Sequence, residues 1–427
     1  MKNLNILNEL KIRGFISQIS NINDFERFLL FNQISLYCGF DPTSDSLHVG
    51  HILPLICLAW FKKYNHKAIV LIGGATALIG DPSFKNQERL LHDSNFTSFC
   101  SKKIIDQILL FFKNINLSPP IIVNNYDWFK KINLISFLRD IGKFFLVNQM
   151  ISKTFVKDRI NRSDQGISFT EFSYNLLQSY DFLELYKTYK VHLQIGGSDQ
   201  WGNILSGIDL IRKLYHDQTF GLTVPLLTQP NGVKFGKTEK DKIIWLNRDK
   251  TSPYAFYQFW LNIQDESIID FLKLFTFLEI SEIQKIKYDF DILSKDYFYF
   301  KSILADHITR IIHGQHELDA AKRITNSLFF GNINHLKESD FDQLRQDGIP
   351  SIDLNGSEDL RQALVLSGLS SSRNDAYKLI NSNAISVNNK KEKNPNYLFH
   401  ATDKLFGKFT ILLKGKKKYS LLCWRGY

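Results

Sequence analysis

The chain has 427 residues, a length that predicts two or three domains at roughly 150 residues each. Its apolar content of 44% includes no uninterrupted apolar run of about 18 residues and no signal peptide, and its four cysteines are widely spaced, so we expect a cytoplasmic protein without membrane partner, disulfide framework or structural zinc. The net charge of +10 favours a polyanionic partner, although a Lys-rich composition can also reflect nucleotide bias in the genome.

Four short apolar runs end in glycine or polar residues, and several of them lead into a helical pattern. The runs cover residues 34–40, 67–74, 191–197 and 222–229, and the helical patterns cover 47–64 and 202–214. This alternation predicts βαβ units around a parallel sheet, and thus a Rossmann-like α/β domain over residues 1–245. In such sheets ligands bind beyond the carboxyl ends of the strands, which is where the unusual residues of this sequence stand.

The rest of the chain changes character twice. Residues 246–330 are amphipathic and predict an α-helical domain, whereas 331–356 are polar and broken by Gly and Pro, which predicts a linker. Residues 357–389 have the pattern of two short helices, a turn and a strand. From Ala401 to the chain end the sequence has one acidic residue, Asp403, and a cluster of basic ones. The basic residues are Lys404, Lys408, Lys414, Lys416, Lys417, Lys418 and Arg425. Such a cluster suits a phosphate backbone, and a solvated basic tail is the alternative.

Two histidines, His48 and His51, stand three residues apart just after the first predicted strand. A residue within 44–46 is expected to cap a helix that begins near Leu47, which places both imidazoles on one face of its first turn. Free N–H groups and the helix dipole favour an anion there, and Gly50 lets a flat base approach the backbone. The alternatives are a zinc site, for which the H-E-x-x-H pattern is missing, and a plain surface pair.

A second candidate for anion binding is the segment GVKFGKT, residues 232–238. It is one residue short of a P-loop, because a P-loop would need glycine where Asn231 stands. Lys234 and Lys237 are three residues apart in a loop after a strand, where they could neutralise a leaving pyrophosphate. A solvated charged loop is the alternative.

A polar stripe is expected on the helix that begins near residue 169. Ser168 and Glu171 have the spacing of a capping box, and Tyr174, Gln178 and Asp181 follow at i, i+4 and i+7 on one face. A buried polar stripe is costly unless a ligand or other protein groups satisfy it. The sequence alone leaves both possibilities open.

Five motifs occur in a fixed order along the chain: HVGH, GGATALIGDP, EFSYNLLQSYD, IGGSDQWGN and KFGKT. From about residue 34 to the C-terminus this set resembles the class I aminoacyl-tRNA synthetases, and within them the bacterial tyrosyl-tRNA synthetases. The resemblance implies a nucleotide-binding Rossmann-like domain, an α-helical domain, an S4-like tRNA-binding domain over 357–427, and a homodimer formed near 120–160. It also implies activation of L-tyrosine with ATP, accompanied by Mg²⁺, to tyrosyl-adenylate and pyrophosphate, and then transfer to the 3′ end of tRNA(Tyr).

The resemblance also assigns roles to single residues. The substrate phenol would be bound by Tyr37 and Asp181, and its α-ammonium group by Asp81, Tyr174 and Gln178. The set implied for the ATP phosphates and pyrophosphate is His48, His51, Lys85, Arg89, Lys234, Lys237 and Thr238. Further contacts to tyrosine, ATP or adenylate are implied for Gly39, Asp41, Thr43, Gly50, Gly197, Asp199 and Gln200. No metal ligand is implied, and Phe84 and Ala77 depart from the family pattern near the basic loop.

No general base is obvious, and none is required for the first step, because the substrate carboxylate is already ionised and attacks the α-phosphorus in line. Catalysis would then come from positioning and from groups matched to the developing charge. One alternative is a nucleotidyltransferase with another acceptor, which would not need the polar face of 174–181 or the C-terminal module. Another is a non-catalytic synthetase-like RNA-binding protein, against which the full ATP-site set argues.

Overall fold

The computed structural model describes residues 4–83, 92–160, 166–227, 236, 242–293, 297–331, 333–356, 358–416 and 418–425. The chain forms two compact units, Met1–Leu246 with Gln264–Phe300, and Asn247–Ile263 with Lys301–Tyr427. The helices predicted for residues 246–330 are present, but they are divided between these units. Apart from the linker over residues 331–356, the domain boundaries drawn from the sequence stay a prediction.

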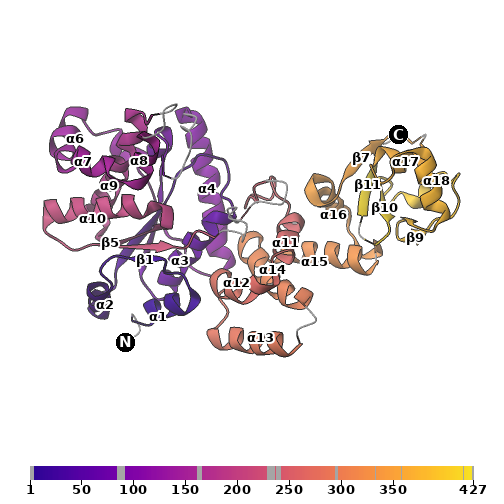
Figure 1. Ribbon diagram of the computed structural model, residues 1–427, viewed down its shortest axis with the longest axis horizontal. Helices are drawn as coiled ribbons and strands as arrows, with labels where there is room; N and C mark the ends of the chain where they lie inside the picture. Colours follow the sequence, from indigo (N-terminus) through magenta and orange to yellow (C-terminus); the bar gives the residue numbers. More distant parts are fainter. Residues whose placement is uncertain are drawn as a thin grey trace. The chain divides into compact units, whose positions relative to one another are not determined.

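The first unit is built around a parallel sheet (Figure 1). Within the described residues the sheet has six strands in the order β1-β6-β5-β2-β3-β4, and only β1 and β6 are antiparallel neighbours. The strands are Gln18–Ile19 (β1), Ser35–Phe40 (β2), Lys67–Ile72 (β3), Ile121–Asn124 (β4), Val191–Gly197 (β5) and Phe220–Val224 (β6). The predicted parallel α/β fold is confirmed. From β2 the chain proceeds to β3 on one side and later to β5 on the other, so the switch point of the sheet lies between β2 and β5.

Side chains that alternate along β2 decide what covers each face of this sheet. The ring of Tyr37 lies 5.5 Å from that of Phe182 on α9, centroid to centroid. On the opposite face, burial raises the pKa of the Cys57 thiol of α3 well above its ordinary value, with a further contribution from nearby Cys38. The sheet therefore lies between α3 and the layer that contains α9. The covering helices are α3 (Ile52–Lys63), α9 (Phe169–Tyr189) and α10 (Trp201–Tyr215).

One strand of this sheet was not expected. The segment 120–160 was predicted as a dimer-forming insertion, but its first residues form β4, which pairs in parallel with β3. A run of only four residues has too little periodicity to mark a strand by itself. The other helices of the first unit are α1 (Leu4–Arg13), α2 (Ile22–Phe31), α4 (Ser94–Asn114), α5 (Tyr126–Phe129), α6 (Leu134–Asp140), α7 (Val147–Ile151), α8 (Thr154–Ile160), α12 (Ile268–Phe275) and α13 (Ile280–Leu293).

The second unit holds a mixed sheet with the order β7-β11-β10-β8-β9 in the described residues. Its strands are Ser351–Leu354 (β7), Ile385–Val387 (β8), Lys390–Lys391 (β9), Phe409–Lys414 (β10) and Lys418–Trp424 (β11). Its helices are α11 (Pro253–Leu261), α14 (Tyr297–His313, which begins in the first unit), α15 (Gln315–Phe330), α16 (Glu338–Gln343), α17 (Leu360–Leu366) and α18 (Arg373–Asn381). The helix, helix and strand predicted for 357–389 are confirmed as α17, α18 and β8.

The prediction of a linker over residues 331–356 was wrong. Phe341 and Leu344 are fully buried in a core with Ile411 and Leu421, and β7 pairs in parallel with β11. The few apolar residues of this polar stretch are the ones that the core takes up, which a composition count does not reveal. Among the described residues, none of the helices is long and apolar enough to cross a membrane.

Candidate active site

Polar residues that follow the parallel strands meet at one edge of the first sheet, because the carboxyl ends of parallel strands share an edge. Asp41 follows β2, Thr76 follows β3, and Asn125 follows β4. Thr76 Oγ1 donates to Asp41 Oδ1 at 2.7 Å, and Asn125 Nδ2 donates to Thr76 Oγ1 at 2.9 Å. The edge predicted to bind ligands is therefore lined by a connected polar network.

The predicted histidine pair lies at this edge, just before α3. His48 is itself the N-cap of a 3₁₀ turn, Val49–His51, and its Nδ1 accepts from the Gly50 N–H at 3.1 Å. The His48 N–H donates to His51 Nδ1 at 3.1 Å, and the two ring centroids are 4.0 Å apart. A Cβ on Gly50 would lie 2.9 Å from His48 Cε1, so the close approach requires glycine. The pair is confirmed as one constellation of two adjacent imidazoles.

The cap expected within residues 44–46 was wrong, because Leu47 is not helical. The Leu47 N–H donates to Gln107 Oε1 at 3.0 Å, and the Leu47 carbonyl accepts from the Leu246 N–H at 2.8 Å. These bonds keep the chain extended up to His48, which forms a bridge with Trp245. The start of the helix was therefore decided by partners about 60 and 200 residues away, which no local pattern contains.

The same pairing brings Gly236, the one described residue of the KFGKT segment, next to the histidine turn. Gly236 has a φ of +103°, and a Cβ there would lie 3.3 Å from Val49 Cβ. The Gly236 carbonyl accepts from the Ile244 N–H at 2.9 Å. Gly236 of the second predicted anion-binding motif thus adjoins Val49 of the first. The other predicted residues of the basic loops lie outside the described residues, namely Phe84, Lys85, Arg89, Lys234, Lys237 and Thr238.

The polar stripe of α9 faces this network. Tyr174 donates its hydroxyl proton to Asp41 Oδ2 at 2.6 Å. Burial raises the pKa of Tyr174 well above its ordinary value, and Asp41 and Asp81 add to the effect. A Cβ on Gly73 would lie 1.8 Å from Asp41 Oδ1, so only glycine leaves room for this carboxylate. Asp41, assigned to ATP by resemblance, therefore also holds Tyr174.

A buried carboxylate and a buried phenol mark the deep end of the stripe. Asp181 is 2% exposed and accepts hydrogen bonds from Asn125 Nδ2 at 3.0 Å and from Trp128 Nε1 at 2.9 Å. Burial still raises its pKa well above the ordinary value. Tyr37 is 1% exposed, and its hydroxyl has no hydrogen-bond partner among the described residues. Asn125 and Trp128 were missed from the sequence, although Asn125 ends the run IIVNN, residues 121–125, in which three apolar residues lead into two asparagines.

A third group of side chains surrounds Asp81. Its Oδ1 accepts from the Ser83 N–H at 2.9 Å, and its Oδ2 accepts from Gln200 Nε2 at 2.8 Å. Gln178 Oε1 accepts from Asn203 Nδ2 at 3.0 Å. The structure thus brings the predicted residues Asp81, Gln178 and Gln200 together through Asn203, which sequence reasoning missed.

Four predicted nucleotide contacts lie on or after β2 and β5. Gly39 is an exposed residue of β2, and the Thr43 N–H donates to the Asp41 carbonyl at 2.8 Å. Gly197 ends β5, and a Cβ there would lie 2.5 Å from Asp199 Oδ1. Their position at the switch point agrees with a nucleotide site, and their contacts to ATP stay a prediction.

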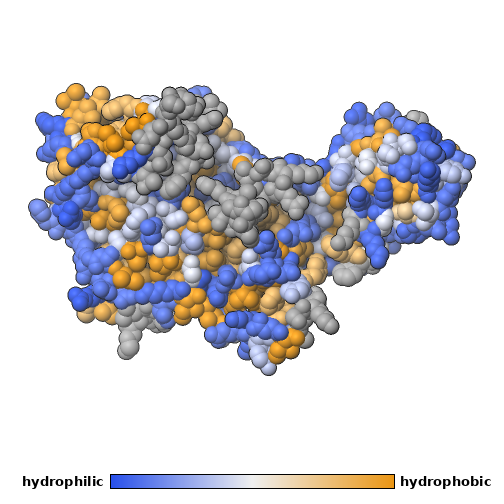
Figure 2. Space-filling model, viewed as in Figure 1, coloured by the Kyte–Doolittle hydropathy of each residue, from blue (hydrophilic) through white to orange (hydrophobic). Residues whose placement is uncertain are grey.

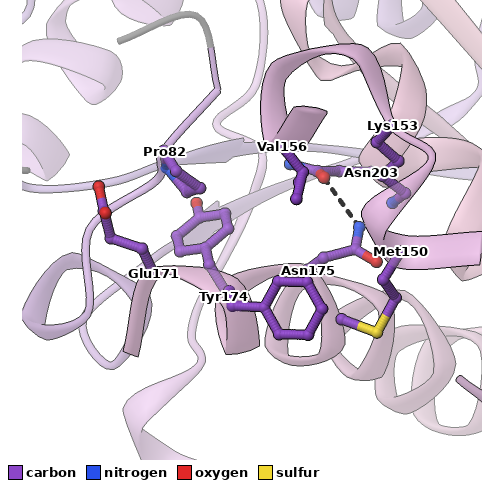
Figure 3. Close-up of a pocket in the computed structure, with 9 residues that line it drawn as sticks. Pro82, Met150, Lys153, Val156, Glu171, Tyr174, Asn175 and Asn203 are labelled. Carbon is purple, nitrogen blue, oxygen red and sulfur yellow. Dashed lines mark hydrogen bonds between the residues drawn. The ribbon is translucent and has the colours of Figure 1, made fainter. Parts of the chain in front are cut away.

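The beginning of α9 is held by a buried ion pair and adjoins a small cavity (Figure 3). Ser168 caps the helix by accepting from the Glu171 N–H at 3.2 Å. The Glu171 carboxylate does not complete the predicted capping box but lies 2.9 Å from Arg159 Nη2. Lys153, on the cavity wall, donates to the Gly202 carbonyl at 3.1 Å, and burial lowers its pKa to about 8. Residues before α9 therefore anchor the helix that carries the polar stripe.

Family models match almost the whole chain. The model described as tRNA synthetases class I (W and Y) matches residues 31–330, and the one described as Tyrosine--tRNA ligase SYY-like C-terminal domain matches residues 340–422. Tyrosine--tRNA ligase of Buchnera aphidicola subsp. Acyrthosiphon pisum (strain Tuc7) is 53% identical over 425 residues, which are 99% of this chain and 100% of the relative. The enzyme of Escherichia coli O139:H28 is 52% identical over 426 residues, 100% of both chains.

Solved structures of tyrosyl-tRNA synthetases are also similar to this chain. A C-terminally truncated mitochondrial tyrosyl-tRNA synthetase of Aspergillus nidulans superimposes with a TM-score of 0.68 at 31% identity, over 76% of this chain and 94% of that chain. A truncated mitochondrial enzyme of Coccidioides posadasii gives 0.65 at 28% identity, over 74% and 90%.

A parallel sheet with paired histidines at its switch point, and Gly236 of a second motif beside Val49 between them, is the arrangement of a class I aminoacyl-tRNA synthetase. Within this class, the relatives that share about half of all residues with this chain over its whole length are tyrosine--tRNA ligases. The chain belongs to the tyrosine--tRNA ligase family. Its reaction is the activation of L-tyrosine with ATP, followed by transfer of tyrosine to the 3′ end of tRNA(Tyr). This sets aside the nucleotidyltransferase and non-catalytic alternatives.

Proposed function

We propose that the substrate phenol binds between Tyr37 and Asp181. The observation that carries this proposal is the Tyr37 hydroxyl, which is buried beside a carboxylate and lacks a hydrogen-bond partner among the described residues. Buried polar groups are normally paired, so an unpaired one at a ligand-binding edge points to a ligand. A phenol supplies one donor for Asp181 and one acceptor for Tyr37, whereas phenylalanine would leave both unsatisfied.

The α-ammonium group is proposed to bind among Asp81, Tyr174 and Gln178. Tyr174 directs its proton to Asp41, so its oxygen is left as an acceptor. The Gln178 carbonyl oxygen and the Asp81 carboxylate are acceptors as well. An ammonium group has three donors and no acceptor, which matches this set.

The phosphates of ATP are proposed to bind at His48 and His51, with Lys85, Arg89, Lys234, Lys237 and Thr238 completing the charge stabilisation. Adjacency of Gly236 to Val49 supports this, because Gly236 belongs to the second motif and Val49 lies between the two histidines. Mg²⁺ is proposed to arrive with ATP as part of the substrate. Mg²⁺ is commonly bound through substrate phosphates together with one or two carboxylates. We place the reaction in the cytoplasm, where translation uses its product.

The test is the change Tyr37→Phe, assayed by pyrophosphate exchange with each of the twenty amino acids. We expect tyrosine to drive exchange best in the native protein. The variant should lose about 1 kcal/mol of the preference for tyrosine over phenylalanine, roughly fivefold. Its stability in urea should be unchanged or higher, since the hydroxyl that is removed has no partner in the described part of the chain.

Tyr257→Phe is the matched control, because the Tyr257 hydroxyl donates to Asp306 at 2.9 Å. That variant should lose about 1 kcal/mol of stability and none of the amino-acid preference. A stability loss in Tyr37→Phe equal to that of the control, with the preference intact, would show that the Tyr37 hydroxyl is structural.

A homodimer is proposed through α6, α7 and the chain between them, where apolar side chains gather on the surface (Figure 2). The exposed fractions are 66% for Leu134, 70% for Ile135, 46% for Leu138, 50% for Leu146 and 58% for Val147. Apolar patches of this kind mark protein contacts. Ile135→Glu should give monomers in light scattering at micromolar concentration, whereas Phe31→Glu, at a side chain 86% exposed elsewhere, should leave the dimer intact. A native monomer would contradict the proposal.

The C-terminal S4-like module is proposed to bind the phosphate backbone of tRNA. Of the predicted basic cluster, Lys408 pairs with Glu338 and Arg425 with Asp353, whereas Lys416 and Lys418 are exposed and form no ion pair among the described residues. Lys404 lies 4.6 Å from the centroid of the Trp424 ring and Lys414 donates to the Leu369 carbonyl at 2.8 Å, so the charges proposed for tRNA are those of Lys416 and Lys418. Truncation beyond residue 350 is a poor test here, because it would also remove strands from a core shared with α11 and α15.

Changing Lys416 and Lys418 together to Glu should weaken tRNA binding and reduce the slope of log K against log salt by about 2, because fewer counterions are released. Tyrosine-dependent pyrophosphate exchange should not change. Arginine at both positions keeps the charge and should keep the slope. An unchanged slope in the Glu variant would place the tRNA contact elsewhere.

A further inference from the structure

Side-chain amides, two of them buried and two half-buried, form a hydrogen-bonded network that ends on Asp81. Gln200 Nε2 donates to Asp81 Oδ2 at 2.8 Å, and Asn203 Nδ2 lies 3.5 Å from Gln200 Oε1 and 3.0 Å from Gln178 Oε1. Asn175 Nδ2 in turn donates to Asn203 Oδ1 at 2.8 Å, the bond drawn in Figure 3. Asn175 and Asn203 are 5% and 2% exposed, so water does not compete for the bond between them.

The direction of every amide in this chain follows from its last member. An ionised carboxylate only accepts hydrogen bonds, so Gln200 must turn its NH₂ group to Asp81 and its oxygen to Asn203. Asn203 must then present NH₂ on that side and its oxygen to Asn175. Asn175 answers with its own NH₂ group, and its Oδ1 is buried without a partner among the described residues. The chain therefore starts at Asn175 and has one polarity throughout.

Gln178 takes its orientation from the same chain. Because Asn203 Nδ2 donates to it, Gln178 turns its carbonyl oxygen, and not its NH₂ group, toward Asn203 and the surroundings of Asp81. An oxygen there can accept a further hydrogen bond from an ammonium group. An NH₂ group at the same place would set a donor against the three N–H donors of the ammonium group. Reversal of Asn203 would leave its oxygen against the oxygens of both glutamines, and Gln178 would have to turn over.

We propose that Asn203 and Asn175 are positioning residues that set the amide orientation of Gln178 for the α-ammonium group of the substrate. This inference rests on the proposed role of Gln178. It adds a role for Asn175, whose side-chain amide contacts none of the proposed substrate-binding side chains. Asn175 controls recognition of the amino acid through Asn203.

The test is Asn175→Asp, which keeps the shape of the side chain but replaces the amide by a carboxylate that can only accept hydrogen bonds. Asn203 must then turn its NH₂ group to the new carboxylate, which reverses the chain. We expect the KM for tyrosine in pyrophosphate exchange to rise about tenfold, with kcat and the KM for ATP nearly unchanged, since a hydrogen bond to a charged group is lost. Asn203→Asp removes the donor to Gln178 directly and should give the same split, so it serves if the first variant does not fold.

Two probes separate recognition of the ammonium group from general loosening of the site. Tyramine keeps the ammonium group, and 3-(4-hydroxyphenyl)propionate lacks it. In calorimetric titrations both variants should bind tyramine about tenfold more weakly and bind the propionate as the native protein does. Equal weakening of both ligands would overturn the inference, because it would show a merely structural role.

Two further variants complete the design. Ser179→Ala removes a buried hydroxyl that donates to the backbone carbonyl of Asn175 at 2.7 Å and does not contact its side-chain amide. This variant should leave the affinities for tyramine and for the propionate unchanged. Gln178→Ala tests the proposed site itself. If it leaves tyramine binding unchanged, the ammonium site is wrong. If it weakens tyramine binding while Asn175→Asp and Asn203→Asp do not, only the positioning role is refuted.

Discussion

Replacing Asp181 by alanine is expected to lower kcat/KM for tyrosine in pyrophosphate exchange by about 10²- to 10³-fold. A hydrogen bond to a charged group contributes roughly 1.5–3 kcal/mol, and the change also leaves the buried donors of Asn125 and Trp128 without their acceptor, at roughly 1–3 kcal/mol each. Part of that loss falls on stability rather than on binding. The low kcat/KM for phenylalanine should change little, because that substrate has no phenol to lose.

Asp217→Ala is the matched control for this experiment. Asp217 also accepts from a tyrosine of α9, because the Tyr186 hydroxyl donates to it at 2.6 Å, but this pair lies at the far end of the helix. The control should keep both kcat/KM values. If Asp181→Ala lowered the values for tyrosine and phenylalanine by the same factor, Asp181 would be a structural residue and the phenol would bind elsewhere.

Breaking the buried ion pair between Arg159 and Glu171 is expected to reduce the free energy of unfolding by about 3–5 kcal/mol. The side chains are 3% and 1% exposed, and Arg159 Nη2 lies 2.9 Å from Glu171 Oε2. Arg159→Met leaves a buried carboxylate without its cation, and Glu171→Gln removes the charge that the guanidinium neutralises. Because Glu171 lies one turn before Tyr174, we also expect weaker tyrosine binding in both variants.

Urea denaturation of the two single variants and the double variant measures the coupling. The double variant should be more stable than the sum of the single losses predicts, by about 0.5–3 kcal/mol, because no unpaired charge remains. Lys130→Met is the exposed control, since Lys130 pairs with Asp127 at 2.8 Å with side chains 46% and 65% exposed. It should lose less than about 1 kcal/mol. If the loss of unfolding free energy in the double variant equalled the sum of the two single losses, Arg159 and Glu171 would not stabilise the fold as an ion pair.

Short-range signals in the sequence determined much of this fold. The short apolar runs placed β2, β3 and β5, because strands covered on both faces are apolar throughout, and the helical patterns placed α3 and α10. Tyr174, Gln178 and Asp181 could be placed on one helix face by the same helical period. The motif order predicted the family, and the chain belongs to it.

The tertiary structure decided which of these elements meet. Tyr174 donates to Asp41, 133 residues earlier, only because β2 lies beside β5 in the sheet and α9 covers that face. Asn125 and Trp128 reach Asp181 only because the short β4 joins the sheet next to β3. The N-cap at His48 depends on pairing with residues near 246. A local pattern carries no information on strand order or on distant partners, and a buried hydrogen bond forms between whichever groups the sheet brings together.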